Sequence, residues 1–134
     1  EIYTLSLHDA LPISYLLSYE GEQRSERVLR QIEADLPRYC VEQNDLLVPL
    51  RYLNTHPGES DAIICAALES IFDLPRGIAC GIVDDWGQEF ITPAIRRSLI
   101  KARQLSNNDV VTARIDCLLA GKHFDIGKFL NKRK

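Results

Sequence analysis

Apolar residues recur every three or four positions along most of this chain, and this period restricts the fold more than any other feature of the sequence. Such a period is typical of an α-helix that buries one face. It is strongest between residues 61 and 72, where the apolar stripe consists of Ile63, Ile64, Ala67, Leu68 and Ile71, widened by Ala62, Cys65 and Ala66. A helix that is apolar on most faces belongs in the interior. We therefore expect an all-α fold, a compact bundle of about six short helices, in which the helix at 61–72 is central.

Capping signals divide the rest of the chain into further helices. We expect these at 22–36, 46–53, 73–86, 93–105, 107–120 and 125–130, with candidate N-caps at Asn44–Asp45, Ser60, Asp73, Thr92 and Ser106. Gly77 and Gly81 would each cost a helix interior about 1 kcal/mol relative to alanine, so a strand at 77–83 is the alternative there. The sequence shows no convincing internal repeat, although the alternation of helices and turns is compatible with a solenoid.

The first thirteen residues, Glu1 to Ile13, differ in character from the rest. They resemble one reading frame of a widely used sequencing-adapter oligonucleotide, and the chain contains no methionine. We therefore interpret residues 1–13 as a translated artefact that makes few core contacts. Residues 14–134 are expected to form a single helical domain, long enough for a core of its own, and we leave open whether an N-terminal element is missing.

Charge is distributed unevenly along the chain. Residues 15–91 contain 14 acidic and 6 basic residues, whereas residues 92–134 contain 3 acidic and 10 basic residues, including all five lysines. On the predicted helix at 93–105, helical spacing gathers four cations on an arc of about 160° opposite the apolar face: Arg96, Arg97, Lys101 and Arg103. Two interpretations stay open. Either the halves attract each other within the fold or the cations are simply solvated, or the arc is a surface for a nucleic acid or an acidic partner.

The acidic pair Asp84–Asp85 lies in the last turn of the predicted helix before Gly87, where the helix dipole disfavours negative charge. Residues that break a local rule are often paired or functional. Adjacent carboxylates on a helix point about 100° apart, which makes a shared metal ion difficult. We expect one of the two to pair with Arg96 or Arg97, and we keep both as candidate contacts with a partner.

Signals for catalysis, metals, cofactors and membranes are weak. No nucleophile elbow, P-loop, dinucleotide fingerprint or zinc-protease motif is present, so we predict no catalytic residue and no cofactor. The four cysteines lack the close pair typical of a zinc site and favour free thiols in a reducing cytosol. His56 or His123 would support an enzyme only by meeting a cysteine or carboxylate in a cleft. The longest apolar run, Ala62 to Leu68, is far shorter than the ~20 residues of a membrane span.

These features favour a small cytoplasmic interaction or regulatory module that binds an acidic protein partner through a basic C-terminal face. The alternative is a DNA- or RNA-binding regulator that uses the helices at 93–120 and the basic tail, because these helices have helix-turn-helix spacing. Three features count against the alternative, and one is that the acidic first half of the chain would repel DNA. The turn between the helices lacks a glycine, and we expect the second helix to expose a set unsuited to DNA: Asp109, Thr112, Arg114 and Asp116.

Overall fold

Helices make up all the regular secondary structure in residues 25–132, the part of the chain that the computed structural model describes. They are α3 (Ser25–Ala34), α4 (Leu47–Asn54), α5 (Asp61–Leu68), α6 (Asp73–Trp86), α7 (Pro93–Leu105), α8 (Asp109–Leu119) and α9 (Ile126–Lys132), with two 3-10 helices, η1 (Leu36–Cys40) and η2 (Gln88–Phe90). The all-α prediction is therefore confirmed for this part. The interpretation of residues 1–13 as an artefact falls outside the described residues, as do Arg133 and Lys134.

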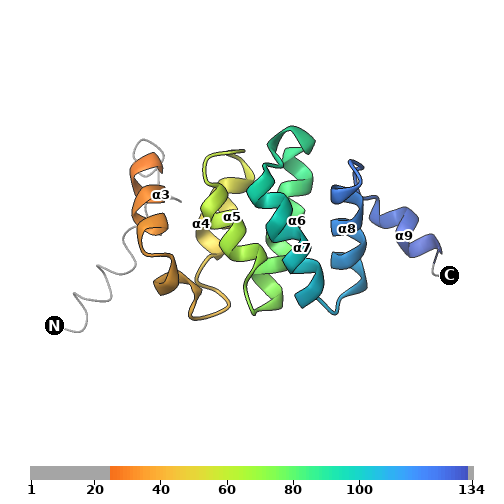
Figure 1. Ribbon diagram of the computed structural model, residues 1–134, viewed down its shortest axis with the longest axis horizontal. Coiled ribbons are helices and arrows are strands. Elements are labelled where there is room, and N and C mark those ends of the chain that lie inside the picture. Colours follow the sequence, from red (N-terminus) through yellow and green to blue (C-terminus); the bar gives the residue numbers. More distant parts are fainter. Residues whose placement is uncertain (1–24, 133–134) are drawn as a thin grey trace.

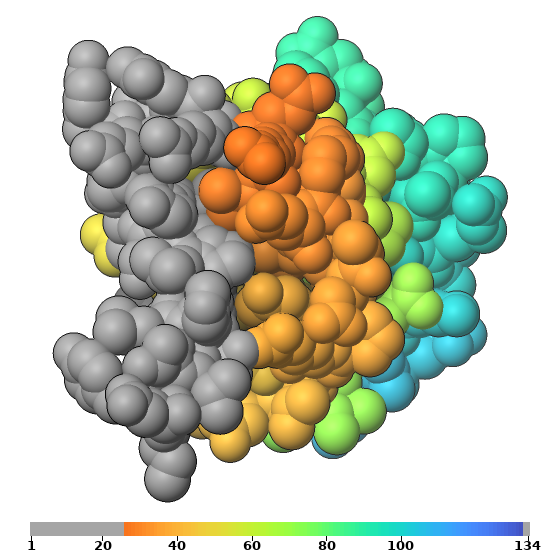
Figure 2. Space-filling model, turned by 90° about the vertical axis from the view of Figure 1, so that its left-hand side faces the viewer, coloured from red at the N-terminus to blue at the C-terminus, as the bar shows by residue number. Residues whose placement is uncertain are grey.

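The helices form two layers, and successive helices alternate between them (Figure 1). In one layer α5 contacts α3 and α7, and in the other α6 contacts α4 and α8. Among the described residues, α3 and η1 cover the N-terminal end of the two layers, and the later helices lie behind them (Figure 2). Since α5 also packs on α4, α6 and η1, its predicted central position is confirmed. The helix–turn–helix rhythm thus corresponds to a side-by-side stacking of helix pairs.

The core runs between the layers and draws on most of the helices. Its largest fully buried side chains are Leu29, Ile32, Leu50, Leu53, Ile63, Ile64, Leu68, Val83, Ile95, Leu99, Ile115 and Leu118. Each such leucine or isoleucine stabilises the fold by roughly 1.5–3 kcal/mol relative to exposure. The single tryptophan, Trp86, joins the core and donates a hydrogen bond from its indole nitrogen to the Leu53 carbonyl at 2.8 Å. This bond ties the end of α6 to α4.

Two predicted N-caps are confirmed by hydrogen bonds. Ser60 Oγ accepts from the Ile63 amide at 3.2 Å, and Thr92 Oγ1 accepts from the Ile95 amide at the same distance. Each bond satisfies one of the free amides of a first helical turn, which is worth about 1 kcal/mol. These caps fix where α5 and α7, neighbours in one layer, begin.

Three other predicted caps are wrong because each side chain has a different partner. Asp45 accepts hydrogen bonds from the amides of Val41 and Glu42 at 3.1 and 2.8 Å, so α4 begins without a side-chain cap. Asp73 is the first residue of α6 and pairs with Arg76.

Ser106, the third of these residues, donates to the Ala102 carbonyl at 2.7 Å instead of capping the next helix. Asn108 caps α8 in its place, because its Oδ1 accepts from the amides of Val110 and Val111 at 2.8 and 3.2 Å. The second helix of the α7–α8 pair therefore starts at Asp109 and not at 107.

The central helix is shorter than predicted, since α5 ends at Leu68 and not at 72. The Ser70 carbonyl accepts a hydrogen bond from the buried Arg76 side chain at 2.6 Å, and the Ser70 hydroxyl accepts from the Phe72 amide at 3.0 Å. These bonds hold the chain in a turn. The assignment of Ile71 to the apolar stripe was wrong, because this side chain is 79% exposed.

The strand considered at 77–83 is also wrong, because α6 is helical through both of its glycines. A Cβ added at Gly77 would lie 3.8 Å from Val111, and one at Gly81 would lie 3.3 Å from the Arg114 guanidinium. Both contacts come from α8. The close approach of α6 and α8 offsets the low helix propensity of glycine and leaves room for Arg114 beside α6.

Candidate functional site

The four cations predicted as one arc are exposed on α7 in two rows that face different neighbours. Toward α8, Arg96 donates to the Leu119 carbonyl at 3.1 Å, and Arg103 binds both carboxylate oxygens of Asp116 at 2.5 and 3.2 Å. Lys101 pairs with Glu69 in the other direction, at 2.9 Å. The remaining cation, Arg97, has no hydrogen-bond or ion-pair partner within residues 25–132. Three of the four cations therefore already bind other residues of the domain.

Glu69, which directly follows α5, gathers polar contacts from α7. The Ser98 hydroxyl donates to it at 2.7 Å, and Lys101 Nζ binds its other oxygen. The Ser98 hydrogen bond, followed by the Lys101 contact, holds the pKa of Glu69 below its ordinary value. Because Glu69 belongs to the acidic half of the chain and Lys101 to the basic half, the expected attraction between the halves is confirmed here.

Asp84 is buried at the end of α6, with partners other than those predicted. Its Oδ2 lies 3.6 Å from Arg114 Nε, and its Oδ1 lies 2.9 Å from His123 Nδ1. The predicted pairing with Arg96 or Arg97 is wrong, since Arg96 reaches Leu119 and the space beside Gly81 admits Arg114. Arg114, whose guanidinium is always charged, offsets part of the unfavourable position of a carboxylate at a helix C-terminus.

Arg114 links this buried carboxylate to the segment after α8. Its guanidinium carbon lies 5.2 Å from the centroid of the Phe124 ring, a cation–π distance. The side chain is half-buried and not exposed as predicted. Arg114 and His123 together hold the turn between α8 and α9 against α6.

Asp84 and His123 line a small hollow of about 120 Å³, together with Gln88 and Lys122. Nucleophilic catalysis would also need a thiol or hydroxyl bonded to the imidazole. Cys117 lines an adjoining hollow with His123, but no hydrogen bond joins their side chains in the part of the chain described. His123 thus meets the condition set above, a histidine beside a carboxylate in a cleft. Because no thiol or hydroxyl within residues 25–132 is bonded to its imidazole, we assign the pair to anchoring. His56 stacks on Tyr52 with ring centroids 3.9 Å apart and has a local role.

A hollow of about 440 Å³ lies between α8 and α9, and we call it the α8–α9 hollow. Its apolar wall is formed by Ala113, Cys117, Phe124 and Phe129. Three lysines also line it: Lys122, Lys128 and Lys132. None of their ammonium groups has an ion-pair partner within residues 25–132. His123 and Asp125 complete the lining, so the hollow combines an apolar surface with a positive charge that one carboxylate offsets only in part.

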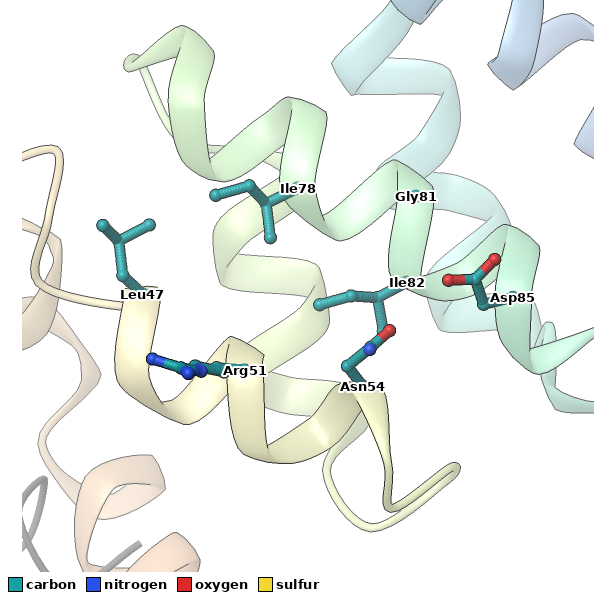
Figure 3. A pocket seen from close by; sticks show the side chains of 7 residues that line it. All are labelled: Leu47, Arg51, Asn54, Ile78, Gly81, Ile82 and Asp85. Carbon is teal, nitrogen blue, oxygen red and sulfur yellow. The ribbon is translucent and has the colours of Figure 1, made fainter. Parts of the chain in front are cut away.

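A larger hollow of about 510 Å³, the α4–α6 groove, lies between two neighbours of the same layer (Figure 3). Leu47, Arg51 and Asn54 of α4 form one wall, and Ile78, Gly81, Ile82 and Asp85 of α6 form the other. Asp85 is exposed here, whereas its neighbour Asp84 is buried on another face. Of the predicted acidic pair, only Asp85 is therefore accessible to a partner.

Comparison of the chain with protein-family models, curated proteins and solved structures found no match. Within residues 25–132, no helix has both the length and the apolar character needed to cross a membrane. In the same range, no group of three or more His, Cys, Asp or Glu side chains is placed to hold a metal ion. The chemistry of the two hollows is thus the main guide to function.

Sequence reasoning missed the α4–α6 groove. Leu47, Arg51 and Asn54 recur at i, i+4 and i+7, so a shared helix face could have been recognised. Its opposite wall comes from α6, which begins about twenty residues further on. Only the packing of the layers brings the two walls together.

Proposed function

We propose that this domain is a helical interaction module that binds an acidic segment of a partner protein through its basic C-terminal face, centred on the α8–α9 hollow. The observation that carries the proposal is the set of three lysines around a partly aromatic hollow, without ion-pair partners in the described residues. A partly exposed apolar surface with mainly positive charge around it, here three lysines against Asp125, is typical of a site for an acidic partner.

The partner segment should combine carboxylates with a large apolar side chain. The part-buried Phe129 ring, which packs on the buried Phe124 with 5.7 Å between centroids, offers an apolar contact, while the lysines meet carboxylates at the rim. Rim charges mainly steer association and select the partner. The apolar contact supplies most of the affinity, because burial of apolar surface is the dominant favourable term in association.

The predicted arc on α7 has a secondary role in this proposal. For Lys101 and Arg103, a partner carboxylate must compete with Glu69 and Asp116, which already bind them. We therefore expect Arg97 to contribute more than these two, and the lysines of the hollow to contribute most.

We also propose that the module acts in the cytoplasm. All four cysteines are free thiols: Cys40, Cys65, Cys80 and Cys117. Free thiols are typical of a reducing compartment.

The test is a fluorescence-anisotropy titration with a labelled peptide in which glutamates flank a phenylalanine. Lys128→Glu should weaken binding about tenfold, because an attraction becomes a repulsion. Lys101→Glu, the matched control in an existing ion pair, should weaken it less than about threefold. Circular dichroism verifies that both variants are folded. Unchanged affinity for Lys128→Glu would contradict the proposal.

The nucleic-acid alternative is tested with the same proteins and a single-stranded oligonucleotide. The same three lysines could contact phosphates, whose binding weakens steeply with salt. If the oligonucleotide binds more tightly than the peptide and its affinity falls steeply with salt, the protein-partner proposal is wrong.

A further inference from the structure

We propose a second binding surface, in which the α4–α6 groove takes a short extended segment of a partner protein with mixed charge. This segment presents one apolar side chain, flanked by a carboxylate on one side and a cation on the other. The groove is formed by α4 and α6, whereas the basic C-terminal face is formed by α8 and α9. The two surfaces therefore have different chemistry and can be tested separately.

The polar groups of the groove lack side-chain partners in the part of the chain that the structure describes. Arg51, Asn54 and Asp85 are exposed, and none of their side chains forms a hydrogen bond or ion pair within residues 25–132. Many other cations of the described chain differ in this respect, since Arg96 and Lys101, for example, have internal partners. The groove thus retains an unpaired cation, amide and carboxylate around an apolar floor.

The dimensions of the groove suit a few residues of extended chain. The lining residues span Leu47 to Asn54 on α4 and Ile78 to Asp85 on α6, which is about 10 Å along each helix axis. That length corresponds to about three residues of an extended strand. The volume of about 510 Å³ admits one large apolar side chain and its backbone. Leu47, Ile78 and Ile82 provide the apolar contact.

The charges of the groove are separated along its length. In Figure 3 the Arg51 side chain extends along α4 toward Leu47, whereas Asp85 lies at the other end, beyond Ile82. A uniformly acidic segment would meet Asp85, and a uniformly basic one would meet Arg51. A mixed segment pairs with both, and the Asn54 amide can bond its backbone. Asp85 would also repel the phosphates of a nucleic acid.

The experiment compares three peptides with a central leucine, flanked by one glutamate and one lysine, by two glutamates, or by two lysines. All proteins compared carry Lys128→Glu, so that the diglutamate peptide does not bind the α8–α9 hollow, and this parent protein should bind the mixed peptide best. Asp85→Lys should shift the preference to the diglutamate peptide, and Arg51→Glu should shift it to the dilysine peptide, each by about tenfold. Arg27→Glu, an exposed control on α3, should leave the order unchanged. Ile78→Ala should weaken all three peptides alike.

Two results would overturn the proposal. One is equal affinity for the three peptides in the Lys128→Glu parent, or the same order in this parent and in its Arg51→Glu and Asp85→Lys derivatives. The other is concentration-dependent dimerisation, seen by sedimentation and abolished by Asp85→Lys, which would make a second copy the occupant. Lys128→Glu should not alter binding of the mixed peptide, so failure of the basic C-terminal face and failure of this groove are distinguishable.

Discussion

Asp84→Asn is expected to lower the free energy of unfolding by about 2 kcal/mol. The substitution keeps the shape of a side chain that is 5% exposed but removes the charge that faces Arg114 and His123. Breaking a fully buried ion pair costs about 3–5 kcal/mol, because the remaining charge is left uncompensated. Here the partners are 26% and 72% exposed, so water compensates part of this loss and the lower figure follows.

The matched control is Asp85→Asn, the same change one residue later. Asp85 is exposed and has no ion-pair partner among residues 25–132. Its loss should change stability by less than about 0.5 kcal/mol, in the stabilising direction, because a negative charge leaves a helix C-terminus. Urea unfolding followed by the fluorescence of Trp86, the single tryptophan, and by circular dichroism gives both values.

A double-mutant cycle with Arg114→Met isolates the pair itself. The coupling between positions 84 and 114 should be about 1 kcal/mol, and the double variant should recover part of the stability lost in Asp84→Asn. Equal effects of Asp84→Asn and Asp85→Asn, with a coupling below about 0.3 kcal/mol, would refute the role assigned to this buried charge.

Three further predictions concern single residues. Arg76→Ala should destabilise the protein by about 2–4 kcal/mol in the same urea assay, because the buried Arg76 guanidinium donates to the Ser70 and Leu105 carbonyls. A loss below about 1 kcal/mol would show that these hydrogen bonds contribute little to stability. Burial raises the pKa of Cys80 to about 12. Iodoacetamide at mildly alkaline pH should therefore alkylate the exposed Cys40 and leave Cys80 unmodified until urea unfolds the chain. Peptide mapping that finds both cysteines labelled at the same rate in the folded protein would contradict the buried position of Cys80. The pKa of Glu69 is lower in the folded than in the unfolded protein, so its ionised carboxylate stabilises the fold at any pH above its ordinary pKa. This stabilisation is lost as the pH falls through the folded-state pKa. Glu69→Gln should thus be less stable than wild type at neutral pH, with a difference that shrinks on acidification, and a difference independent of pH would rule out this linkage.

The fold was largely predictable because its main signal is local. Apolar spacing and the capping hydroxyls of Ser60 and Thr92 locate α5 and α7, since a helix face and an N-cap depend on residues a few positions apart. The errors arose where a competing contact prevailed, often one only a few residues away, as for Asp45, Asp73 and Ser106. Ile71 follows the helical period, yet Arg76 holds the chain at Ser70 in a turn.

The candidate sites were less predictable for the same physical reason. Helical spacing correctly placed the cations of α7 on the surface, but it could not show that Lys101 would find Glu69 or that Arg103 would find Asp116. Asp84 was recognised as unusual from its helix position alone. Its partner Arg114 lies on another helix, and the space it needs depends on Gly81.

The most direct test of the proposed function is NMR mapping of the full chain with the glutamate–phenylalanine peptide. Amide shifts from Lys122 to Lys132, around the α8–α9 hollow, should change with peptide concentration, while those of α4 should stay constant. Changes confined to α7, or spread evenly over the protein, would contradict the assignment of acidic-partner binding to the lysines of this hollow.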